Sequence, residues 1–433
     1  MKLWQKENIT TSTLVETFTV GNDLLFDIQL AKYDVMGSIA HAKMLQSINV
    51  LTTSELEELL VAFDKINDSI NASSFKLENG VEDVHSQIEF MLTSMVGDAG
   101  KKIHTARSRN DQVATAIKLF CKYEIKSLLS QVNHLFEVLI ALSNQNKSVL
   151  MPGYTHTQIA MPSSFGLWFA SFAESLVDDL QVLLAAYKIA NKNPLGSGAG
   201  YGSSFNINRS LTTALMEFEC LNYNSIYAQA TRGKTEKTFA IALATIASTL
   251  NKLSSDVCLF VNQNYNFISF PNTITTGSSI MPHKKNPDVF ELIRSKTNII
   301  QALPNTLTLM LSNLTTGYHR DVQLTKEVLF PQIQELHNCV QILIEVLPQA
   351  LVNENILQDK KYQYIFSVEA VNNLVNQGIP FRDAYKEIGE QIETGVFNFD
   401  YKNNLHHTHE GSIGNLCNEE IVKMKNDILN QFV

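Results

Sequence analysis

The sequence predicts an all-α protein whose central part is a bundle of long helices. Apolar side chains recur four and three residues apart over long segments, which places them along one face of a helix. No comparably clear alternation of apolar and polar residues is present, so a parallel nucleotide-binding sheet is not expected. A chain of 433 residues that is 45% hydrophobic and 18% charged can bury a sizeable core. We therefore expect long helices that pack at shallow crossing angles.

Several segments carry such an apolar stripe. The first runs from Cys121 to Leu142 and predicts a helix of about 25 residues. Because each stripe needs an apolar partner, the helices are expected to cover one another. The other stripes begin at Phe165, Phe239, Val289 and Leu329.

Shorter helical patterns flank these segments on both sides. The segment from Ser54 to Ile66 begins with a serine that is followed three residues later by a glutamate, which is typical of a capped helix start. Farther along, Asp83 is expected to cap another helix and His85 to turn toward a cleft. Solvated polar residues are the alternative interpretation of this pair. After about residue 355 the long stripes end and shorter patterns follow.

The composition disfavours several classes of function. The net charge of −9 disfavours nucleic acid as a general partner. No uninterrupted apolar run reaches the roughly 18 residues of a membrane span, and the first residues lack the apolar core of a secretory signal. The five cysteines are widely spaced and form no CxxC motif, which favours reduced thiols in a cytoplasmic protein. The histidines that begin at His406 lack helical HxxxH spacing, so no metal site is expected.

One loop carries chemically active residue types at high density. It runs from Thr275 to Glu291, reads TTGSSIMPHKKNPDVFE, and leads into one of the apolar stripes. Gly277 lets the backbone approach a ligand, and the serine hydroxyls and lysine ammoniums that follow can hold an anion. If Ser278 lies beside Lys284, its alkoxide becomes accessible and can remove a proton from a carbon next to a carboxylate. The combination indicates an elimination reaction, and a solvated surface loop is the alternative.

Two further segments contribute suitable groups. KKIHTARSRN, residues 101–110, contains cations and no acid, and its end opens the first long helix, so it suits a small anionic ligand. MPGYTHTQIAMP, residues 151–162, places Thr155 and His156 between two Met-Pro pairs. Histidine is suited to proton transfer near neutral pH. A structural histidine is the alternative.

Two glycine-containing segments lack the context of nucleotide-binding motifs. NPLGSGAGYGSS, residues 193–204, follows no predicted strand, which the dinucleotide fingerprint requires. RGKT, residues 232–235, lacks the first glycine of a P-loop because Ala228 stands in its place. We interpret the first segment as a break between helices that lines a cleft, and we expect no nucleoside triphosphate site.

Together these segments resemble the argininosuccinate lyase family of the fumarase/aspartase superfamily. The resemblance covers nearly the whole chain and rests on GVEDVHSQIE, HTARSRNDQV, MPGYTHTQIAMP, NPLGSGAGYG, GSSIMPHKKNPDVFE and GYHRDVQLTKE. It implies elimination of fumarate from argininosuccinate to give arginine, with a serine base, a carbanion intermediate and neither cofactor nor metal. It also implies a homotetramer with a joint helical core, in which each site is assembled from three subunits.

The resemblance implies a role for each matching residue. Ser278 matches the base that removes the succinyl C–H proton, and His156 matches the group on the acid side, with Glu291 orienting it. Lys284 matches a residue that stabilises the carbanion. The residues implied to contact the substrate are Asp27, Asp83, His85, Ser108, Arg109, Asn110, Thr155, Ser279, Asn286, Tyr318, Gln323 and Lys326.

The same resemblance orders these contacts along the substrate and divides the chain into domains. Arg109 and Asn110 match contacts on the fumarate side, whereas Tyr318, Gln323 and Lys326 match contacts to the argininyl portion. The implied domains are an N-terminal helical domain (1–106), a central long-helix bundle (107–355) that contains the signature loop (275–291), and a C-terminal helical domain (356–433).

Three positions depart from the family pattern. Asp23 stands where better-known members have a serine that touches substrate, and His283 replaces a glutamine. The segment from Arg232 to Lys237 replaces an acidic–arginine–acidic segment, which leaves the equivalence of Arg232 open. These departures concern the amino-acid end of the substrate and do not affect the elimination chemistry.

Two alternative functions are weighed against this one. Another fumarate-releasing lyase of the superfamily would act on a different leaving group, and the segments around Arg109 and from Tyr318 to Lys326 disfavour it. A non-catalytic helical scaffold has no need of Ser278 and His156 together. The sequence therefore favours argininosuccinate as the substrate.

Overall fold

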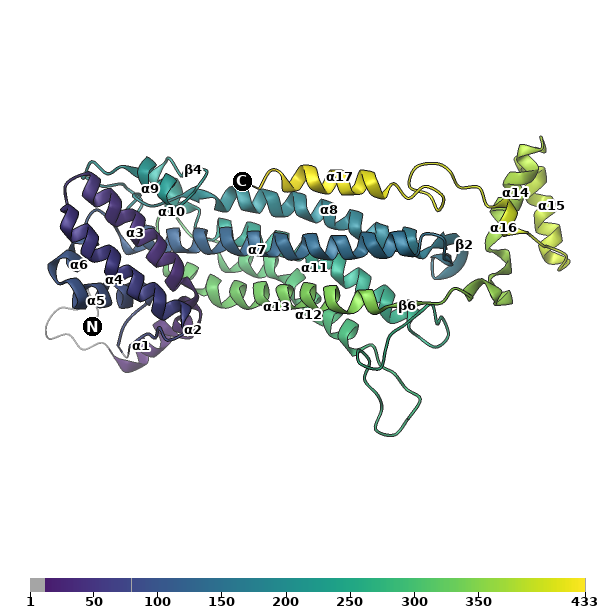
Figure 1. Cartoon of the computed structure of the whole chain (residues 1–433), viewed down its shortest axis with the longest axis horizontal. Helices are drawn as coiled ribbons and strands as arrows, with labels where there is room; N and C mark the ends of the chain where they lie inside the picture. The colour runs from purple at the N-terminus through teal and green to yellow at the C-terminus, as the bar shows by residue number, and fades with distance from the viewer. Residues whose placement is uncertain (1–11, 79, 433) are drawn as a thin grey trace.

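The computed structural model describes residues 12–78 and 80–432 and shows an elongated, mostly helical chain (Figure 1). Long helices run side by side along the molecule, and the N-terminal helices pack across one end. A small helical pair lies at the other end. The prediction of an all-α bundle is confirmed.

The bundle helices bury the apolar stripes that predicted them. Leu135, Phe169 and Leu250, one from each of three stripes, are fully buried. Burial of one such side chain contributes about 1.5–3 kcal/mol, so the stripes supply much of the driving force for folding. The bundle helices are α7 (Arg109–Gln145), α8 (Phe165–Ala190), α11 (Lys234–Phe260), α12 (Asp288–Met310) and α13 (Thr325–Val346).

Helix α7 is longer than its apolar stripe predicted. It has 37 residues instead of about 25 because it begins at Arg109, where Ser108 and Asp111 form a capping box. Its first turns bury polar side chains such as Thr115 and Lys118, so no apolar stripe marks them. Among the described residues, α7 is the helix long and apolar enough to cross a membrane by length and composition. It packs against α8, α11 and α13 within the bundle.

Short helices form the N-terminal layer that covers the start of α7. Helix α3 contacts both α7 and α4, and it thereby joins the layer to the bundle. The elements of this layer are α1 (Thr13–Val20), α2 (Asp23–Asp27), the 3-10 turn η1 (Ile28–Leu30), α3 (Ala31–Ser47), α4 (Thr53–Asn71), α5 (Val84–Val96) and α6 (Asp98–Lys102).

The caps of two N-terminal helices test the sequence prediction directly. Helix α4 is capped by Thr52, whose hydroxyl accepts the Glu55 N–H at 3.2 Å. The predicted cap, Ser54, is wrong because the helix begins two residues earlier than expected. Asp83 caps α5 as predicted and accepts the Ser86 N–H at 2.6 Å.

A β-hairpin follows α7, although the sequence predicted no strand there. β1 (Leu150–Thr155) pairs antiparallel with β2 (Gln158–Ser164), and His156 and Thr157 form the turn between them. Both turn residues have positive φ, 53° and 60°. Turns of this kind usually contain Asn-Gly, so the His-Thr pair carried no turn signal. Two shorter strand pairs are β3 (Lys192–Asn193) with β4 (Cys220–Leu221) and β5 (Ile268–Ser269) with β6 (Leu351–Val352).

The glycine-rich segment 193–204 breaks the helical pattern after α8. Asp111 Oδ2 accepts the N–H of Gly196 at 2.9 Å and that of Gly198 at 2.8 Å, which ties this segment to the start of α7. Both glycines have positive φ, which the absence of a Cβ permits. The short helices α9 (Arg209–Leu215) and α10 (Ser225–Ala230) follow before α11.

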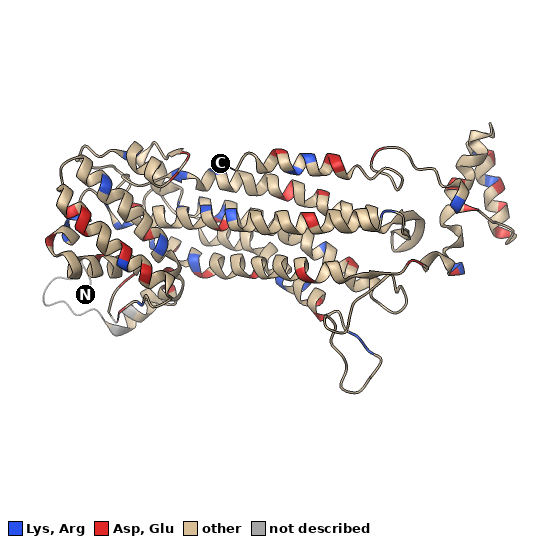
Figure 2. Ribbon diagram, in the orientation of Figure 1, with Lys and Arg blue, Asp and Glu red and all other residues tan. Residues whose placement is uncertain are grey.

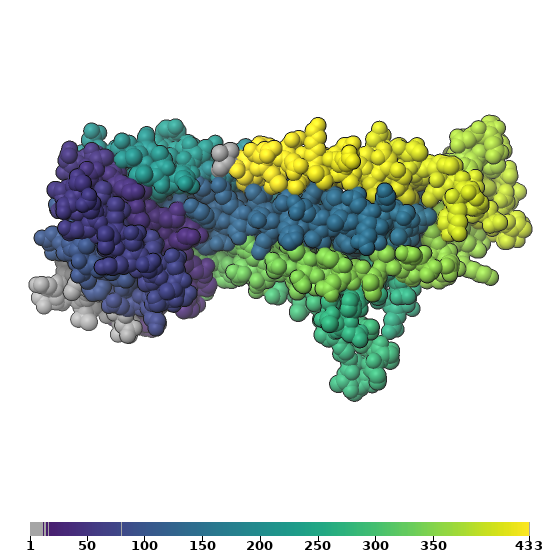
Figure 3. Space-filling model, viewed as in Figure 1, coloured from purple at the N-terminus to yellow at the C-terminus, as the bar shows by residue number. Residues whose placement is uncertain are grey.

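The C-terminal part contains a separate small core and a helix that returns to the bundle. Helices α14 (Ser367–Asn376) and α15 (Phe381–Glu393) enclose Ala370, Val371, Ala384 and Ile388. After α16 (Tyr401–Asn404), α17 (Asn418–Leu429) lies along α8 (Figures 1 and 3). Short 3-10 turns connect these parts: η2 (Arg320–Leu324), η3 (Leu347–Gln349), η4 (Ile356–Gln358) and η5 (Lys360–Phe366).

One buried acid inside the bundle has no cation beside it among the described residues. Asp179 on α8 is 7% exposed, and its Oδ2 accepts the Thr249 hydroxyl of α11 at 2.7 Å. Burial raises the pKa of Asp179 to about 6, although the hydroxyls of Thr249 and Thr245 act in the opposite direction. The folded protein therefore binds this proton more tightly than the unfolded chain does.

Replacing this acid should stabilise the protein in a pH-dependent way. Because the folded-state pKa lies above the ordinary 3.8, the penalty from Asp179 grows as pH rises from about 4 to about 6 and persists above that. We expect Asp179→Asn to raise the free energy of unfolding by up to about 3 kcal/mol at pH 7.5 and to change it little at pH 4. Thermal melts at both pH values measure the difference.

Asp178, which is exposed on the same helix, provides the matched control. Asp178→Asn should change stability by less than about 0.5 kcal/mol at either pH. Equal stabilisation by Asp179→Asn at pH 4 and pH 7.5 would show that ionisation of this carboxyl is not the cause.

Candidate active site

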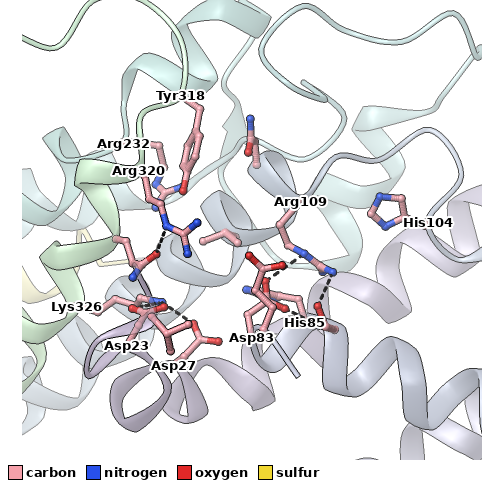
Figure 4. Close-up of a pocket in the computed structure, with 16 residues that line it drawn as sticks. Asp23, Asp27, Asp83, His85, His104, Arg109, Arg232, Tyr318, Arg320 and Lys326 are labelled. Carbon is pink, nitrogen blue, oxygen red and sulfur yellow. Dashed lines mark hydrogen bonds and ion pairs between the residues drawn. The ribbon is translucent and has the colours of Figure 1, made fainter. Parts of the chain in front are cut away.

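A pocket of about 350 Å³ lies where the N-terminal helices meet the first turns of α7 and α13 (Figure 4). Acids and cations both line it, which suits a ligand that carries charges of both signs. The predicted substrate-binding residues in its wall are Asp27, Asp83, His85, Arg109, Asn110, Tyr318, Gln323 and Lys326. Its other residues are Val20, Asp23, Glu82, Ser86, His104, Val113, Arg232 and Arg320.

One wall is organised around Lys326 at the start of α13. Its ammonium donates to Asp27 at 2.6 Å and to Asp23 at 2.9 Å, and its side chain is only 6% exposed. Burial acts to lower the pKa of Lys326, but the two carboxylates outweigh it and raise that pKa. Asp27 also accepts the Val84 N–H at 2.7 Å, which ties α2 to the start of α5. Asp23, one of the departures from the family pattern, is therefore a partner of Lys326.

The opposite wall is organised around Arg109 at the start of α7. Its Nε lies 3.3 Å from Asp83 Oδ2, and its terminal nitrogens donate to Ser86 at 3.1 Å and to Gln112 at 2.7 Å. Glu89 is a weaker partner at 3.9 Å. Burial acts to raise the pKa of Asp83, but Arg109 and the Ser86 N–H lower it overall. Asp83 thus caps α5 and fixes the Arg109 side chain.

Behind this wall, His85 is held by a buried acid. Its Nδ1 lies 2.8 Å from Asp34 Oδ1, and both side chains are at most 1% exposed. Gln112 donates to the same oxygen at 2.8 Å. Burial acts to raise the pKa of Asp34, yet His85 and Arg107 lower it to about 2. The ring of His85 is therefore locked in place at the base of the pocket.

Arg232, Tyr318 and Arg320 lie together above Lys326 in Figure 4. The Arg232 guanidinium lies 5.7 Å from the centre of the Tyr318 ring. Arg320 donates to Gln323 at 3.1 Å and to the Thr19 carbonyl at 3.3 Å. Arg320 was not among the predicted site residues, although it lies within GYHRDVQLTKE. Its positive charge was the only feature of the sequence that could have indicated that Arg320 lies in the site.

The predicted acid-side residue lies far from this pocket. His156 and Thr155 are exposed in the hairpin beyond the C-terminal end of α7, whereas Arg109 is at its N-terminal end. Because α7 has 37 residues, the two ends are about 55 Å apart. Positive φ at His156 follows from its place in the two-residue turn of the hairpin, where both central residues have positive φ. One chain therefore does not bring His156 to its own Arg109.

The signature loop projects from the side of the bundle ahead of α12 (Figures 1 and 3). Thr276 and Asn286 close its base through backbone hydrogen bonds of 2.8 and 3.3 Å. Two residues after Thr276, the Ser278 hydroxyl accepts the N–H of Met281 at 3.1 Å. The remaining predicted residues on this segment are Ser279, Lys284 and Glu291, all of them exposed. None of them lines the pocket at the start of α7.

The described residues of one chain thus hold the predicted site in three separate groups. These are the pocket, the hairpin with His156, and the signature loop with Ser278 and Lys284. Ser108 belongs with the first group, since its hydroxyl caps α7 and accepts the Asn110 N–H at 3.2 Å.

Comparison with known proteins first defines the class. A family model described as Lyase matches residues 6–302, which is more than half of the chain. The fold resembles that of a solved EDDS lyase variant with bound fumarate, with a TM-score of 0.78 and 20% identity over 95% of this chain and 89% of that one. Fold and sequence therefore define a lyase.

Curated relatives then define the family. Argininosuccinate lyase from Bacteroides thetaiotaomicron is 55% identical over 100% of this chain and 96% of the relative. Argininosuccinate lyase from Bacteroides fragilis is 56% identical over 97% of this chain and 93% of the relative. The chain belongs to the argininosuccinate lyase family.

The ion pairs of Lys326 should contribute measurably to stability. Lys326→Met leaves the buried Asp27 and the partly buried Asp23 without their cation, and loss of one partner of a buried pair costs about 3–5 kcal/mol. We expect a lower thermal midpoint for Lys326→Met, and partial recovery when Asp27→Asn is added. Differential scanning calorimetry of the single and double variants measures both effects.

Lys361 provides the matched control because its pair with Asp359 is exposed, at 44% and 51%. Lys361→Met should cost less than about 1 kcal/mol. If the two lysine variants were equally stable, the buried pair would contribute no more than a surface pair.

Proposed function

We propose that this chain is an argininosuccinate lyase, which eliminates fumarate from argininosuccinate and releases arginine. The observation that carries the proposal is a pocket lined by both cations and carboxylates, in a chain of this family. Arg109 offers positive charge at the N-terminus of α7, where the helix dipole also favours an anion. Asp27 and Asp23 offer negative charge on the other wall. The pocket therefore offers counter-charges of both signs to a substrate that carries carboxylates and cationic nitrogens.

The reaction needs a base, a group that stabilises negative charge, and an acid. The base removes a proton from the succinyl carbon next to a carboxylate, and the electron pair forms the double bond of fumarate as the C–N bond breaks. The departing guanidino nitrogen receives a proton. We assign the base to Ser278, charge stabilisation to Lys284 and Asn286, and the acid side to His156 oriented by Glu291. These steps are proton transfers between side chains and substrate, and they call for no cofactor.

The remaining predicted residues position the substrate in this proposal. Arg109 and Asn110 bind the fumarate side, while Tyr318, Gln323 and Lys326 contact the argininyl portion. Asp83 and His85 hold the wall that presents Arg109, as their contacts indicate. Ser108, Thr155 and Ser279 supply hydroxyls close to the reacting groups.

The proposal requires several copies of the chain at each site. Helix α7 separates His156 from Arg109 by more than any side chain can span. Helix α12 exposes Leu292 and Ile299 at 59% and Leu309 at 67%, and most of the ribbon along the bundle in Figure 2 has the colour of uncharged residues. Apolar surface of this kind favours association. We therefore infer a homotetramer with a joint helical core, in which pocket, hairpin and signature loop come from different chains.

The cysteines support a cytoplasmic location for this enzyme. Cys121, Cys220, Cys258, Cys339 and Cys417 are all free. Secreted proteins usually pair their cysteines, whereas the cytosol keeps thiols reduced.

A substrate panel tests the proposed activity. The purified protein is incubated separately with argininosuccinate, adenylosuccinate, aspartate and malate, and the ultraviolet absorbance of fumarate or the loss of substrate is followed. We expect turnover of argininosuccinate alone. Turnover of another substrate would instead indicate a different lyase of the superfamily, and no turnover of any substrate would indicate a scaffold.

Ser278→Ala should lower turnover of argininosuccinate by several orders of magnitude because the base is lost. Retained turnover would remove Ser278 from that role.

Mixed assemblies test whether one site takes residues from different chains. Arg109→Ala and Ser278→Ala should each be nearly inactive alone. When the two chains are coexpressed, random mixing leaves roughly one quarter of the sites with both wild-type residues, if pocket and loop come from different chains. Fumarate release by the purified mixture measures this fraction.

A second mixture provides the control. Ser278→Ala and Lys284→Ala lie on the same loop, so no mixed site regains both residues, and activity should stay low. If the Arg109→Ala and Ser278→Ala mixture also stayed inactive while forming mixed assemblies, the site would not be shared in this way.

A further inference from the structure

A second pocket lies at the hairpin end of the bundle (Figure 1). It has a volume of about 400 Å³ and shares no lining residue with the pocket at the start of α7. The hairpin lines it together with the first turns of α8 and the end of α11. Its volume falls within the range of small-molecule sites, about 300–1,000 Å³. None of the residues assigned to the proposed elimination lines it.

Aromatic rings form a continuous wall of this second pocket. The ring centres of Trp168 on α8 and Phe260 on α11 lie 5.3 Å apart. Tyr265 follows α11, and its ring lies 5.5 Å from that of Tyr154 on β1. The fully buried ring of Phe267 lies 5.3 Å from both Phe260 and Tyr265, which joins the two pairs. The faces of such rings carry partial negative charge and attract cations.

One carboxylate lies at the edge of this aromatic wall. Asp256 on α11 is partly buried and accepts the indole N–H of Trp168 at 3.0 Å. The described part of the chain forms no salt bridge to Asp256, and the exposed Lys252 acts on it at longer range. Burial raises the pKa of Asp256, although the Trp168 hydrogen bond and Lys252 act in the opposite direction. A partly buried carboxylate without a close cation favours a positively charged ligand.

We propose that this pocket binds a small guanidinium compound. A guanidinium group is planar, so it can stack on the rings of Trp168 or Tyr265 while its N–H groups pair with Asp256. An ammonium group lacks the flat face that stacks on a ring. A neutral ligand would leave the charge of Asp256 unbalanced. The proposal does not depend on the proposed function, because the pocket contains none of the residues assigned to the elimination.

Trp168 allows occupancy of the pocket to be followed directly. The chain contains two tryptophans, Trp168 and Trp4, and Trp4 lies outside the described residues. In the full-length Trp4→Phe protein, tryptophan fluorescence therefore comes from Trp168 alone. The probe is L-arginine, and L-citrulline is its matched control because a neutral ureido group replaces the guanidinium. Both are titrated at constant ionic strength.

Arginine should bind more tightly than citrulline. We expect the Kd of arginine, measured from Trp168 fluorescence, to be at least about 10-fold lower, as for a charge-assisted contact. In Asp256→Asn the two ligands should bind within about two-fold of each other. Tyr265→Leu keeps the carboxylate but removes one ring, and it should weaken arginine binding about three-fold.

Asp178→Asn provides the matched control for the substitution. It removes an exposed carboxylate on α8, outside the pocket, and should keep the full preference for arginine. Circular dichroism checks that each variant is folded. If Asp256→Asn fails to fold, the comparison of arginine with citrulline on the Trp4→Phe protein still decides the test.

Three results would overturn the proposal. These are no response of Trp168 to arginine, equal affinity for arginine and citrulline, and an unchanged preference for arginine in folded Asp256→Asn. The titrations measure binding without turnover. Their failure therefore leaves the proposed function standing, and absence of fumarate release leaves this proposal standing.

Discussion

The length and stiffness of α7 constrain everything else in this molecule. A continuously hydrogen-bonded helix of 37 residues extends about 55 Å, so groups fixed at its two ends do not meet. Its N-terminal end presents Arg109 to the pocket, and its C-terminal end leads into the hairpin that carries His156. The catalytic residues that the family resemblance implies are therefore distributed along the length of the bundle. An elongated bundle of this kind can contribute each of its ends to a site that it shares with neighbouring copies.

The pocket at the start of α7 depends on matched charges from distant segments. Lys326 meets Asp23 and Asp27, which lie 303 and 299 residues away in the chain. Each pair offsets the cost of removing charge from water and holds an N-terminal element against the bundle. Arg109 is likewise held by Asp83 and Ser86, so the charged side chains of both walls are fixed in position by their neighbours.

Most of the fold could be predicted from local patterns, and the exceptions have specific causes. The stripes from Phe165, Phe239, Val289 and Leu329 marked their helices because each buries one continuous apolar face. The start of α7 was predicted from the motif at Ser108 and not from the apolar stripe, because polar and small side chains fill the first turns. The hairpin was missed because its turn uses His156 and Thr157 at positive φ.

The site was less predictable because its geometry is not local. Family motifs selected residues such as Asp83 and Lys326, which the structure brings to one pocket. Spacing alone could not show that Asp23 contacts Lys326, since only the folded N-terminal layer brings them together. Residues such as Ser278 and His156 stay apart within one chain, and no single-chain pattern encodes how copies dock.

The position of α17 has a consequence for how the protein is made. Ile421 and Ile428 are buried, and the ring of Phe432 lies 5.3 Å from that of Tyr187 on α8. A chain that ends before residue 418 lacks α17, so the apolar surface of α8 that α17 covers is exposed to solvent. Exposed apolar surface of this kind favours aggregation, so packing of α17 protects α8 from non-specific contacts.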